Sequence, residues 1–418
     1  MTSTVTRRDR RHAVSSPHEH RWPSLAAPKR SPLRATAARA LFTQAVARLD
    51  LRVAFPDGHV IGRGDSSSPL MRILDEDAFF TRLGVDGKIG FGEAYMAGDF
   101  STDDLPGVLT VFAERVMKLV PGRVQRLRRF YDPRKPVEEE NTIAGSRDNI
   151  HRHYDLSNDL FRLFLDDTMT YSCAWFEPGD TFEQAQLRKV DGILDMARVG
   201  PGRRLLEIGT GWGTLAVRAA QRGARVTSLT ISTEQKELAE RRIAEAGVAD
   251  RVEVQLRDYR QAQGQYDAIA SVEMLEAVGE EYLPAFFSAC DRLLATDGWM
   301  GLQTITMPHD RMLASRNAYS WMHKYIFPGG LIPSIEQITS ILAKHTTLRI
   351  TELRDIGADY AVTLAKWRER FLAHCDRVLE LGFDEPFIRM WEFYLSYCQA
   401  GFSTRYVGDS QMGLARHH

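Results

Sequence analysis

Leu205-Leu-Glu-Ile-Gly-Thr-Gly-Trp-Gly213 is the stretch around which the rest of the chain is organised. An apolar run carries Glu207 near its end and then turns sharply, and a helical pattern follows over residues 214–222. Glycine allows a tight turn and lets a ligand approach the main chain, and the first N–H groups of a helix are free to bind that ligand. The pattern predicts a strand, a ligand-binding loop and a helix, with the loop built on Gly209, Gly211 and Gly213.

The spacing of these glycines narrows the choice of ligand. It is G-x-G-x-G, and no Gly-Lys-Ser/Thr follows, so the dinucleotide and P-loop motifs fit poorly. A strand, an acid and a glycine loop in this order resemble the S-adenosylmethionine (SAM) loop of class I methyltransferases. An ordinary tight turn between a strand and a helix is the alternative that the loop alone leaves open.

Length and composition allow two or three domains. The chain has 418 residues, 44% of them hydrophobic, and a net charge of −1, so attraction to an anionic surface must come from local patches. Four scattered cysteines without a C-x-x-C pair indicate neither a zinc site nor a disulfide framework, so we expect no metal and a reducing cytoplasm. No apolar run reaches the ~18 residues of a bilayer-spanning helix, and the basic N-terminus lacks the apolar segment of a secretory signal.

Four parts are expected along the chain. The first is rich in Arg, Ser, Pro and His, which favours a disordered basic tail over an anionic-lipid tether. A small α+β lipid-binding or docking domain follows, with a hairpin around Pro56-Asp-Gly58. Then come a basic linker and a catalytic domain. The boundaries are residues 1–35, 36–118, 119–144 and 145–418.

The expected linker alternates basic residues with Leu127, Phe130 and Tyr131. This mixture suits a phospholipid surface, and it suits a solvated helix face equally well. No nucleic-acid module accompanies the patch, so nucleic acid is not an expected partner. The basic residues are Arg123, Arg126, Arg128, Arg129, Arg134 and Lys135.

From Arg203 onward, apolar strand patterns alternate with helical patterns. Such alternation implies a parallel sheet covered by helices on both faces, and ligands bind such sheets at the carboxyl ends of the strands. A helical insertion is expected over 307–346, and helices rich in aromatic residues over 362–381 and 387–404. The expected strands are 203–207, 225–229, 252–256, 268–271 and 299–305.

A series of motifs extends over about residues 145–410. In order they are Tyr154-Asp-Leu-Ser-Asn-Asp159, Tyr171-Ser-Cys-Ala-Trp-Phe176, the glycine loop, Leu229-Thr-Ile-Ser-Thr-Glu-Gln235, Glu273-Met-Leu-Glu-Ala-Val-Gly279, Lys324-Tyr-Ile-Phe-Pro-Gly-Gly-Leu-Ile-Pro333 and Tyr394-Leu-Ser-Tyr-Cys398. Together they resemble the cyclopropane-fatty-acyl-phospholipid synthases and the mycolic-acid cyclopropane synthases. Residues 87–100 also resemble the small N-terminal domain of the bacterial phospholipid enzymes.

The resemblance implies a class I SAM-methyltransferase fold, a doubly wound α/β sheet with helical insertions. It implies SAM as methyl donor and a cis double bond in a membrane phospholipid as acceptor. An alkene is a weak nucleophile, so the donor must be held in line with it, and the resulting carbocation needs a dry pocket, electron density and a positioned base. We expect an apolar channel that brings the alkene to the glycine loop beside Glu276.

Two products remain open at this point. Proton loss from the new methyl with ring closure gives a cyclopropane, whereas proton loss with formation of a C=C bond gives a 10-methylene chain, the precursor of a 10-methyl chain. The segment Met307-Pro-His-Asp-Arg-Met-Leu-Ala-Ser315, with residues 321–333, resembles the actinobacterial enzymes of the second kind. We therefore expect the methylene product, with a downstream reductase as a further partner.

The resemblance also assigns the cofactor site residue by residue. The glycine loop and Glu207 face the methionine portion of SAM, and the residues after the second strand face its ribose. Ser232-Thr-Glu-Gln235 also reads as a helix cap. The remaining expected contacts are Tyr171, Ser172, Thr230, Ile231, Gln235, Asp258 and Tyr259.

In the family a bound bicarbonate acts as the base. Glu276 is its strongest candidate ligand, because a carboxylate can orient a proton-bearing partner. Gln303 departs from the His of many relatives, and an amide cannot titrate near neutral pH. Cys398 matches a cysteine long regarded as an active-site residue, although a buried structural role is the expectation we favour. The other matching positions are Cys173, Ile305 and Tyr360.

Two other classes of function fit the sequence less well. A small-molecule N- or O-methyltransferase disagrees with the Tyr154 and Tyr171 motifs, and a non-catalytic membrane-binding protein disagrees with Glu276 and the intact glycine loop. We expect a cytoplasmic enzyme associated peripherally with the inner face of the cell membrane. A homodimer, the head-group preference and the position of the double bond are left open.

Overall fold

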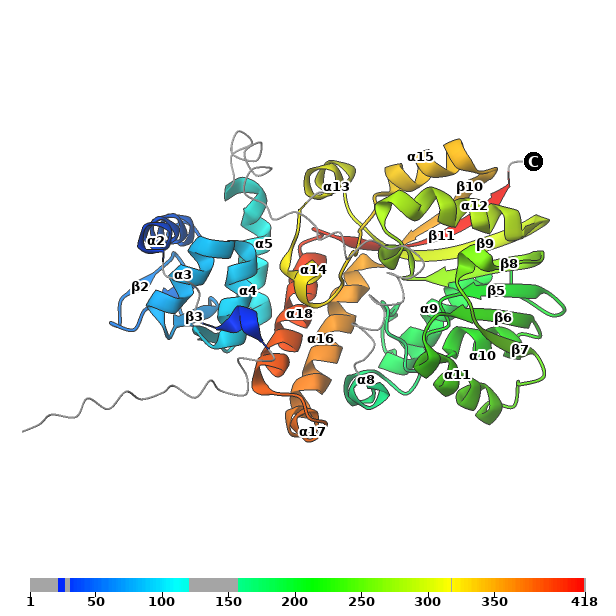
Figure 1. Ribbon diagram of the computed structural model, residues 1–418, viewed down its shortest axis with the longest axis horizontal. Coiled ribbons are helices and arrows are strands. Elements are labelled where there is room, and N and C mark those ends of the chain that lie inside the picture. Colours follow the sequence, from blue (N-terminus) through cyan, green and yellow to red (C-terminus); the bar gives the residue numbers. More distant parts are fainter. Residues whose placement is uncertain (1–21, 27–30, 120–156, 317, 417–418) are drawn as a thin grey trace, which may run out of the picture.

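The computed structural model describes residues 22–26, 31–119, 157–316 and 318–416. An N-terminal α+β unit lies at one end and a large α/β sheet at the other, with the long helices α16 (Gly357–Ala373) and α18 (Glu385–Ser403) between them (Figure 1). Among the described residues, no helix is both long and apolar enough to cross a bilayer. The expected basic linker lies outside the described residues except for Leu119. All the basic residues of its cluster lie outside them as well.

The large sheet has seven strands in the order β10-β11-β9-β8-β5-β6-β7. The expectation of a wholly parallel sheet is wrong at β11, which runs antiparallel between β9 and β10. The chain leaves α18 at the carboxyl edge of the sheet, where Gly408 pairs with Thr306, so it can only run back through the sheet. The strands are β5 (Arg204–Ile208), β6 (Arg225–Thr230), β7 (Val252–Leu256), β8 (Tyr266–Val272), β9 (Leu294–Thr306), β10 (Leu348–Asp355) and β11 (Gly408–Arg416).

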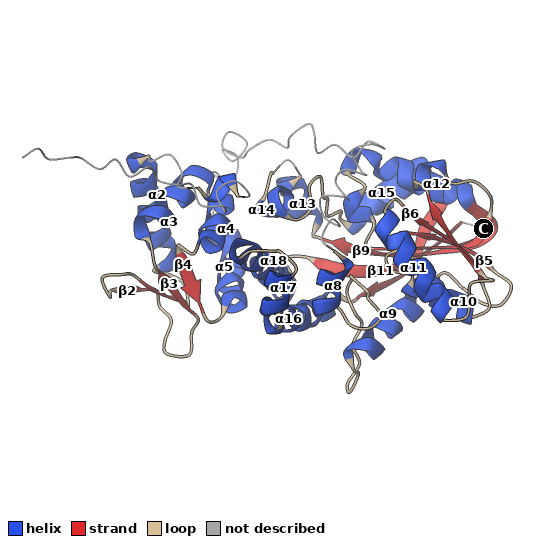
Figure 2. Cartoon of the chain, turned by 60° about the horizontal axis from the view of Figure 1, so that its bottom comes forward, coloured by secondary structure: helices blue, strands red, loops and turns tan. Residues whose placement is uncertain are grey.

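Helices cover both faces of this sheet, as expected for a doubly wound fold. Successive side chains of a strand point to opposite faces, so Leu205 packs with α9, α10 and α11 while Leu206 packs with α12 and α15. Figure 2 shows α12 and α15 on one side of the strands and α9 and α10 on the other. The helices are α9 (Phe182–Met196), α10 (Thr214–Gln221), α11 (Thr233–Glu245), α12 (Leu283–Leu293) and α15 (Ile335–His345).

Short helical segments connect these elements near the carboxyl edge of the sheet. The expected insertion after β9 is helical, and it consists of short pieces rather than one long helix. The segments are α8 (Asn158–Phe164), η4 (Tyr259–Gln261), η5 (Leu275–Ala277), η6 (Glu280–Tyr282), α13 (His309–Ser315), α14 (Trp321–Tyr325) and α17 (Cys375–Glu380).

The N-terminal unit packs helices against a four-stranded sheet of order β2-β1-β3-β4. The expected hairpin is confirmed, since Val53 pairs with Ile61 across a turn that contains Gly58. The glycine-punctuated segment after residue 87 is a buried helix. The elements are α2 (Pro32–Val46), β1 (Arg52–Ala54), β2 (Val60–Ile61), β3 (Leu70–Ile73), α3 (Glu76–Asp86), α4 (Lys88–Ala97), β4 (Phe100–Thr102) and α5 (Leu105–Leu119).

The disorder expected over residues 1–35 is contradicted where the structure describes this segment. The indole N–H of Trp22 contacts both carboxylate oxygens of Asp384, at 2.9 and 3.1 Å. The short helix η1 (Pro23–Leu25) follows, and the Leu25 carbonyl accepts a hydrogen bond from Arg82. Helix α2 then begins at Pro32, a residue suited to the first turn of a helix. Composition alone could not predict these contacts, because their partners lie far away in the sequence.

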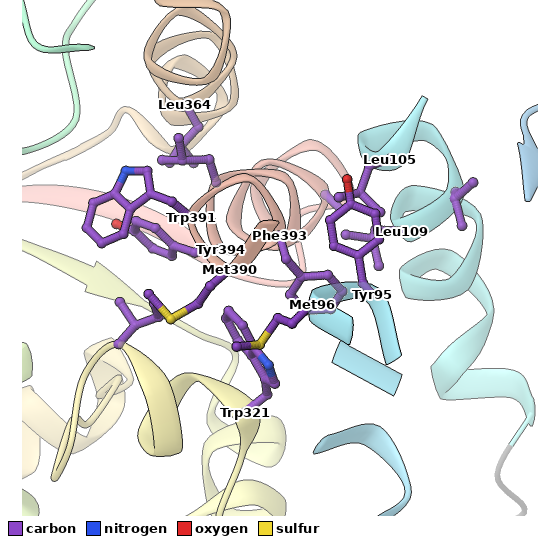
Figure 3. Packing of buried hydrophobic residues seen from close by; sticks show 14 of the residues in the cluster. Tyr95, Met96, Leu105, Leu109, Trp321, Leu364, Met390, Trp391, Phe393 and Tyr394 are labelled. Carbon is purple, nitrogen blue, oxygen red and sulfur yellow. The ribbon is translucent and has the colours of Figure 1, made fainter. Parts of the chain in front are cut away.

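Helix α18 joins the two parts of the molecule. It presents Trp391 and Tyr394 on one side and Phe393 on the other, beside Tyr95 of α4 (Figure 3). The ring of Phe393 also lies 4.7 Å from the ring of Trp321 in α14. A Cβ atom on Gly92 would come within 2.5 Å of Trp321 Cδ1, so only glycine allows α4 to approach α14 this closely. The N-terminal unit is therefore fixed to the helices that border the large sheet.

A buried charge lies in the same interface. Glu93 of α4 is 3% exposed and accepts hydrogen bonds from Lys324 Nζ at 2.5 Å and from the Tyr325 hydroxyl at 2.7 Å. Both donors belong to the Lys324–Pro333 motif found in the sequence. The motif therefore has a structural role in holding the N-terminal unit.

We predict that Glu93→Ala lowers the free energy of unfolding by about 2–3 kcal/mol, because it leaves Lys324 and Tyr325 without their acceptor. The loss should stay below the roughly 3–5 kcal/mol of a fully buried pair, since the Lys324 side chain is 30% exposed. Denaturant unfolding followed by circular dichroism measures it. Glu385→Ala, which removes an exposed pair with Arg389, is the control and should cost less than about 1 kcal/mol. Equal losses in the two variants would contradict the prediction.

Candidate functional site

A cleft of about 160 Å³ opens at the carboxyl ends of β5, β6 and β8, where a doubly wound sheet binds its ligands. It runs from the glycine loop to the start of the Glu273–Gly279 motif. Nearly all the residues expected to contact the cofactor line it: Tyr171, Ser172, Glu207, Gly209, Gly211, Thr230, Ile231, Gln235, Asp258 and Tyr259. Their role in binding stays a prediction, and the structure places them around one cavity.

The glycine loop leaves β5 with a backbone that side chains rarely adopt. Gly209 has a φ of 98°, and a Cβ atom there would come within 2.4 Å of Met274 Cγ. Gly213 was expected to line the cofactor site, but it is not among the residues that line the cleft. It caps α10 with a φ of 90°, and a Cβ atom added to it would lie only 3.2 Å from the Cβ and 3.3 Å from the Cα of Ala239 in α11. Close packing of α10 against α11 is therefore the physical role of Gly213.

The segment after β6 serves both as a helix cap and as a wall of the cleft. Ser232 accepts a hydrogen bond from the Gln235 backbone, so the predicted cap of α11 is confirmed. The Thr230 hydroxyl donates to Gln235 Oε1 at 2.9 Å, which fixes both side chains. After the next strand, β7, Asp258 caps η4 and is held by a two-point ion pair with Arg260. These polar groups are pre-ordered before any ligand binds.

Glu207 lies at the end of β5 and lines the cleft. It is 2% exposed, and burial raises the pKa of its carboxyl to about 8, although the Ser228 hydroxyl donates to it at 2.5 Å. Burial therefore favours the protonated form of this carboxyl group at neutral pH. A bound cation would oppose this effect of burial, since a nearby positive charge favours the ionised form.

The opposite wall of the cleft carries Tyr171 and Ser172. The Tyr171 hydroxyl lies 2.6 Å from the hydroxyl of Tyr394 in α18, and the Tyr171 ring packs 5.2 Å from the ring of Trp367. Ser172 Oγ accepts a hydrogen bond at 2.5 Å from Lys189 Nζ. Lys189 is 1% exposed, and burial lowers its pKa. An aromatic wall and a buried amine thus border the cavity.

Glu273 is the centre of a buried hydrogen-bond network. Its Oε1 accepts from the Cys173 backbone N–H at 2.8 Å and from Gln303 Nε2 at 2.9 Å, and its Oε2 accepts from the Tyr360 hydroxyl at 2.6 Å. Glu273 lines the cleft. Its φ of 49° is a left-handed conformation that costs a non-glycine residue about 1–2 kcal/mol. Strain of this kind persists where surrounding contacts enforce it, as at functional sites.

The residues expected to hold bicarbonate divide between two carboxyl groups. Cys173, Gln303 and Tyr360 donate to Glu273, whereas the Ile305 N–H and the Thr304 hydroxyl donate to Glu276 Oε1 at 2.5 and 2.9 Å. Burial, together with the charge of Glu273, raises the pKa of Glu276 to about 8. Glu276 Oε2 is buried and has no hydrogen-bond partner among the described residues.

Neither of the two predicted cysteines has an activated thiol. Cys173 is fully buried, and burial raises its pKa well above the ordinary value; it contributes its backbone N–H to the site. Cys398 packs against the hydrophobic core, and burial raises its pKa to about 12. The structural role that we favoured for Cys398 agrees with this environment.

Sequence reasoning assigned no role to Glu273, Asp409 or Lys189. A signal for the first was available, because Glu273 and Glu276 stand three residues apart directly after a strand, and such paired acids suit acid–base chemistry. Lys189 and Asp409 carry no local signal. They reach the site only because α9 and β11 pack beside β9.

Known proteins are similar to this chain over the region that forms the cleft. A model of the family described as mycolic acid cyclopropane synthetase matches residues 142–412, which include the whole cleft and the Glu273 network. The chain is 47% identical over 407 residues to tuberculostearic acid methyltransferase UfaA1 of Mycobacterium tuberculosis, covering 95% of each chain. It is 35% identical over 358 residues to cyclopropane-fatty-acyl-phospholipid synthase of Escherichia coli K12, covering 83% of this chain and 87% of that one.

A solved structure agrees with these sequence matches. Mycolic acid cyclopropane synthase CmaA1, complexed with SAH and CTAB, is similar to this chain with a TM-score of 0.60 and 32% identity. The match covers 67% of this chain and 98% of that one.

We predict that Gly209→Ala weakens SAM binding at least tenfold, because the new methyl group would displace Met274 at the wall of the cleft. Isothermal titration calorimetry measures the change. Gly58→Ala is the matched control, since Gly58 has a similar φ of 89° but has no atom within 4 Å of an added Cβ. Both variants carry local backbone strain, so unchanged SAM affinity in Gly209→Ala would show that the loop does not shape the binding site.

Proposed function

The chain belongs to the mycolic acid cyclopropane synthetase family of SAM-dependent methyltransferases, and from this premise we propose that it methylates the cis double bond of unsaturated acyl chains in membrane phospholipids to give a 10-methylene chain. The observation that carries the proposal is the half-buried Glu273 carboxylate, which accepts three hydrogen bonds and lines the cofactor cleft near the glycine loop. The high identity to a tuberculostearic acid methyltransferase over nearly the whole chain supports a methylene product.

The residues of the cleft fit SAM. Gly209 and Gly211 leave the main chain open for close approach, and the ordered Thr230, Gln235 and Asp258 side chains offer polar groups for a ribose and a purine. When bound, SAM supplies an electrophilic methyl group whose C–S bond breaks with its electron pair remaining on sulfur. The aromatic wall around Tyr171 and Tyr394 offers electron-rich rings to positive charge and excludes water from the acyl side.

Glu273 is the base in this proposal. The π electrons of the alkene form the new C–C bond and leave a cation on the neighbouring carbon. A hydride shift brings that cation to the methyl-bearing carbon. Glu273 then takes a proton from the new methyl group, and the electrons of that C–H bond become the C=C bond between the former methyl carbon and the acyl chain. The three donors on Glu273 keep its carboxylate aimed.

Bicarbonate, the base implied by the family resemblance, is the second candidate. Its expected donors Cys173, Gln303 and Tyr360 are already engaged by Glu273, so this arrangement does not fit an additional anion. The feature that favours bicarbonate is Glu276 Oε2, which lacks a partner on a carboxyl that stays protonated up to a pH of about 8. Such a group could donate to an anion.

The proposal also includes the lipid partner of the enzyme and the place in the cell where the enzyme acts. The acceptor is a lipid, and the enzyme works from the cytoplasmic face of the membrane as a peripheral protein, with the N-terminal unit as its docking domain. The basic cluster 123–135, a homodimer, the acyl channel beside Glu276 and a reductase that consumes the methylene product stay predictions. A cyclopropane product is the alternative outcome of the same first step, as the similarity to the Escherichia coli synthase allows.

We predict that purified protein, SAM and oleoyl-phospholipid vesicles give a lipid with the NMR signals of a methylene group (C=CH2) attached to the acyl chain. Mass alone does not separate this product from its cyclopropane isomer, so the spectrum is the readout. Cyclopropane signals would overturn the methylene assignment and keep the family activity. Methylation of soluble amines without methylation of lipid would overturn the lipid activity and indicate a small-molecule methyltransferase.

We predict further that Glu273→Gln lowers kcat about 100-fold or more, in the range of lost general-base catalysis, while SAM affinity changes less than threefold. Glu276→Gln, which is isosteric and keeps the acceptor for Ile305, is the matched variant and should lower kcat less. Turnover in bicarbonate-free buffer under argon should equal turnover in air. A rate that falls on bicarbonate removal and returns on its addition would give the role of base to bicarbonate.

A further inference from the structure

Asp409 is a buried carboxyl group that the mechanism above does not use. It lies on β11 opposite Ile305 of β9 and is fully buried. Its Oδ2 accepts a hydrogen bond at 3.0 Å from Gln303 Nε2, the same nitrogen that donates to Glu273 Oε1 at 2.9 Å, so one amide group holds the two carboxyl groups next to each other. Asp409 Oδ1 accepts no hydrogen bond from a donor among the described residues. That oxygen is therefore available to carry a proton.

Two carboxyl groups in contact inside a protein share a proton, because two adjacent negative charges away from water repel strongly. The surroundings decide which of the two keeps it. Glu273 accepts from the Cys173 N–H, Gln303 and Tyr360, and donors of this kind stabilise a charge. Among the donors that the structure describes, only the second N–H of Gln303 reaches the Asp409 carboxyl group, and burial raises the pKa of Asp409 well above the ordinary value. The difference in donors and in burial therefore favours the proton on Asp409.

Gln303 has the chemistry that this arrangement requires. Its amide nitrogen donates to Glu273 Oε1 and to Asp409 Oδ2, one N–H to each carboxyl group. Its amide oxygen accepts from Gln411 Nε2 at 3.1 Å, so the orientation of the amide is set by β11. Gln411 Nε2 also donates to the Lys189 carbonyl, which ties the bridge to α9. A ring nitrogen of histidine carries a single N–H and could not bridge both carboxyl groups in this way.

We propose that Asp409 is a positioning residue that carries the proton of this pair, and that its protonated side chain donates a hydrogen bond to Glu273 and keeps the Glu273 carboxyl group aimed into the cleft. This inference rests on the proposed role of Glu273 as base. After Glu273 has taken the proton of the substrate, both carboxyl groups are neutral. Glu273 borders the cleft, so its proton returns to water when the products leave.

Other charged and titratable groups surround the pair from each neighbouring element. The Lys189 cation interacts with both Glu273 and Asp409 and offsets the charge that they share. Glu276 acts on Asp409 in the opposite sense, because an ionised Glu276 would favour the protonated form of Asp409 further. The remaining groups near the network are Cys173, Tyr360, Tyr394, Asp166, Asp355 and Asp359.

The experiment compares Asp409→Asn with Asp409→Ala. Asparagine keeps an N–H to donate to Glu273 and an oxygen to accept from Gln303, but it cannot ionise. We expect kcat of Asp409→Asn within about threefold of wild type at neutral pH. The wild-type rate should fall at alkaline pH, where Asp409 loses its proton and the two carboxylates repel each other, and Asp409→Asn should lack that fall. Asp409→Ala should lose at least 20-fold in kcat with KM for SAM within threefold.

Glu352→Gln is the control, since Glu352 lies on the neighbouring strand with an exposed side chain; it should behave as wild type throughout. An Asp409→Asn variant that keeps the alkaline fall, or that is as inactive as Asp409→Ala, would overturn the proposal.

A second measurement separates this inference from the identity of the base. Infrared spectroscopy of wild-type protein with isotope-labelled aspartate should show the carbonyl band of a protonated carboxylic acid at neutral pH, and Asp409→Asn should lack it. Absence of the band in the wild type would overturn the shared proton even if Glu273→Gln is inactive. Presence of the band together with a fully active Glu273→Gln would keep the shared proton and remove Glu273 as base. The wild-type spectrum decides the matter even if a variant does not fold.

Discussion

A carboxylate removed from water must receive hydrogen bonds or lose its charge, and this constraint organises the site. Glu273 meets it with donors from three different elements: the backbone before α9, the carboxyl-terminal part of β9 and the first turn of α16. Each donor is buried, so none can be exchanged for water without disturbing the core. The geometry of one charged group thus depends on the packing of the sheet and of the helical layer together.

The helices α16 and α18 extend this dependence across the molecule. Tyr360 of α16 reaches Glu273, Tyr394 of α18 reaches Tyr171 at the cleft, and Phe393 on the opposite side of α18 packs against the N-terminal unit. A displacement of the N-terminal unit would therefore be felt at the wall of the cleft through a single helix. This connection gives a physical reason why a chain of this family, whose match begins near residue 142, can make use of an additional N-terminal unit.

Local patterns predicted much of the α/β part. The apolar runs and the helical periodicity after Arg203 gave five strands and their helices near their observed bounds. Helix α9 was missed although it begins with a capping box between Thr181 and Gln184, a signal visible in the sequence. Strand β11 was missed for a different reason: its residues are small or polar, and only pairing with both β9 and β10 makes it a strand.

The sequence by itself determined the glycine loop, the class of fold, the cofactor and the family, because these depend on residues that are close together along the chain or on motifs in a fixed order. The tertiary structure alone decided how the acids and amides meet. Cys173, Glu273, Gln303, Tyr360 and Asp409 are separated by tens of residues, and the partners of each become known only when β9, β11 and α16 are packed. The family resemblance predicted that these donors surround a small anion. In the folded chain, the Cys173 N–H, the Gln303 amide and the Tyr360 hydroxyl instead donate hydrogen bonds to the Glu273 side chain. A buried charge takes its hydrogen bonds from whichever donors the fold brings within reach, and that choice is made by packing in three dimensions.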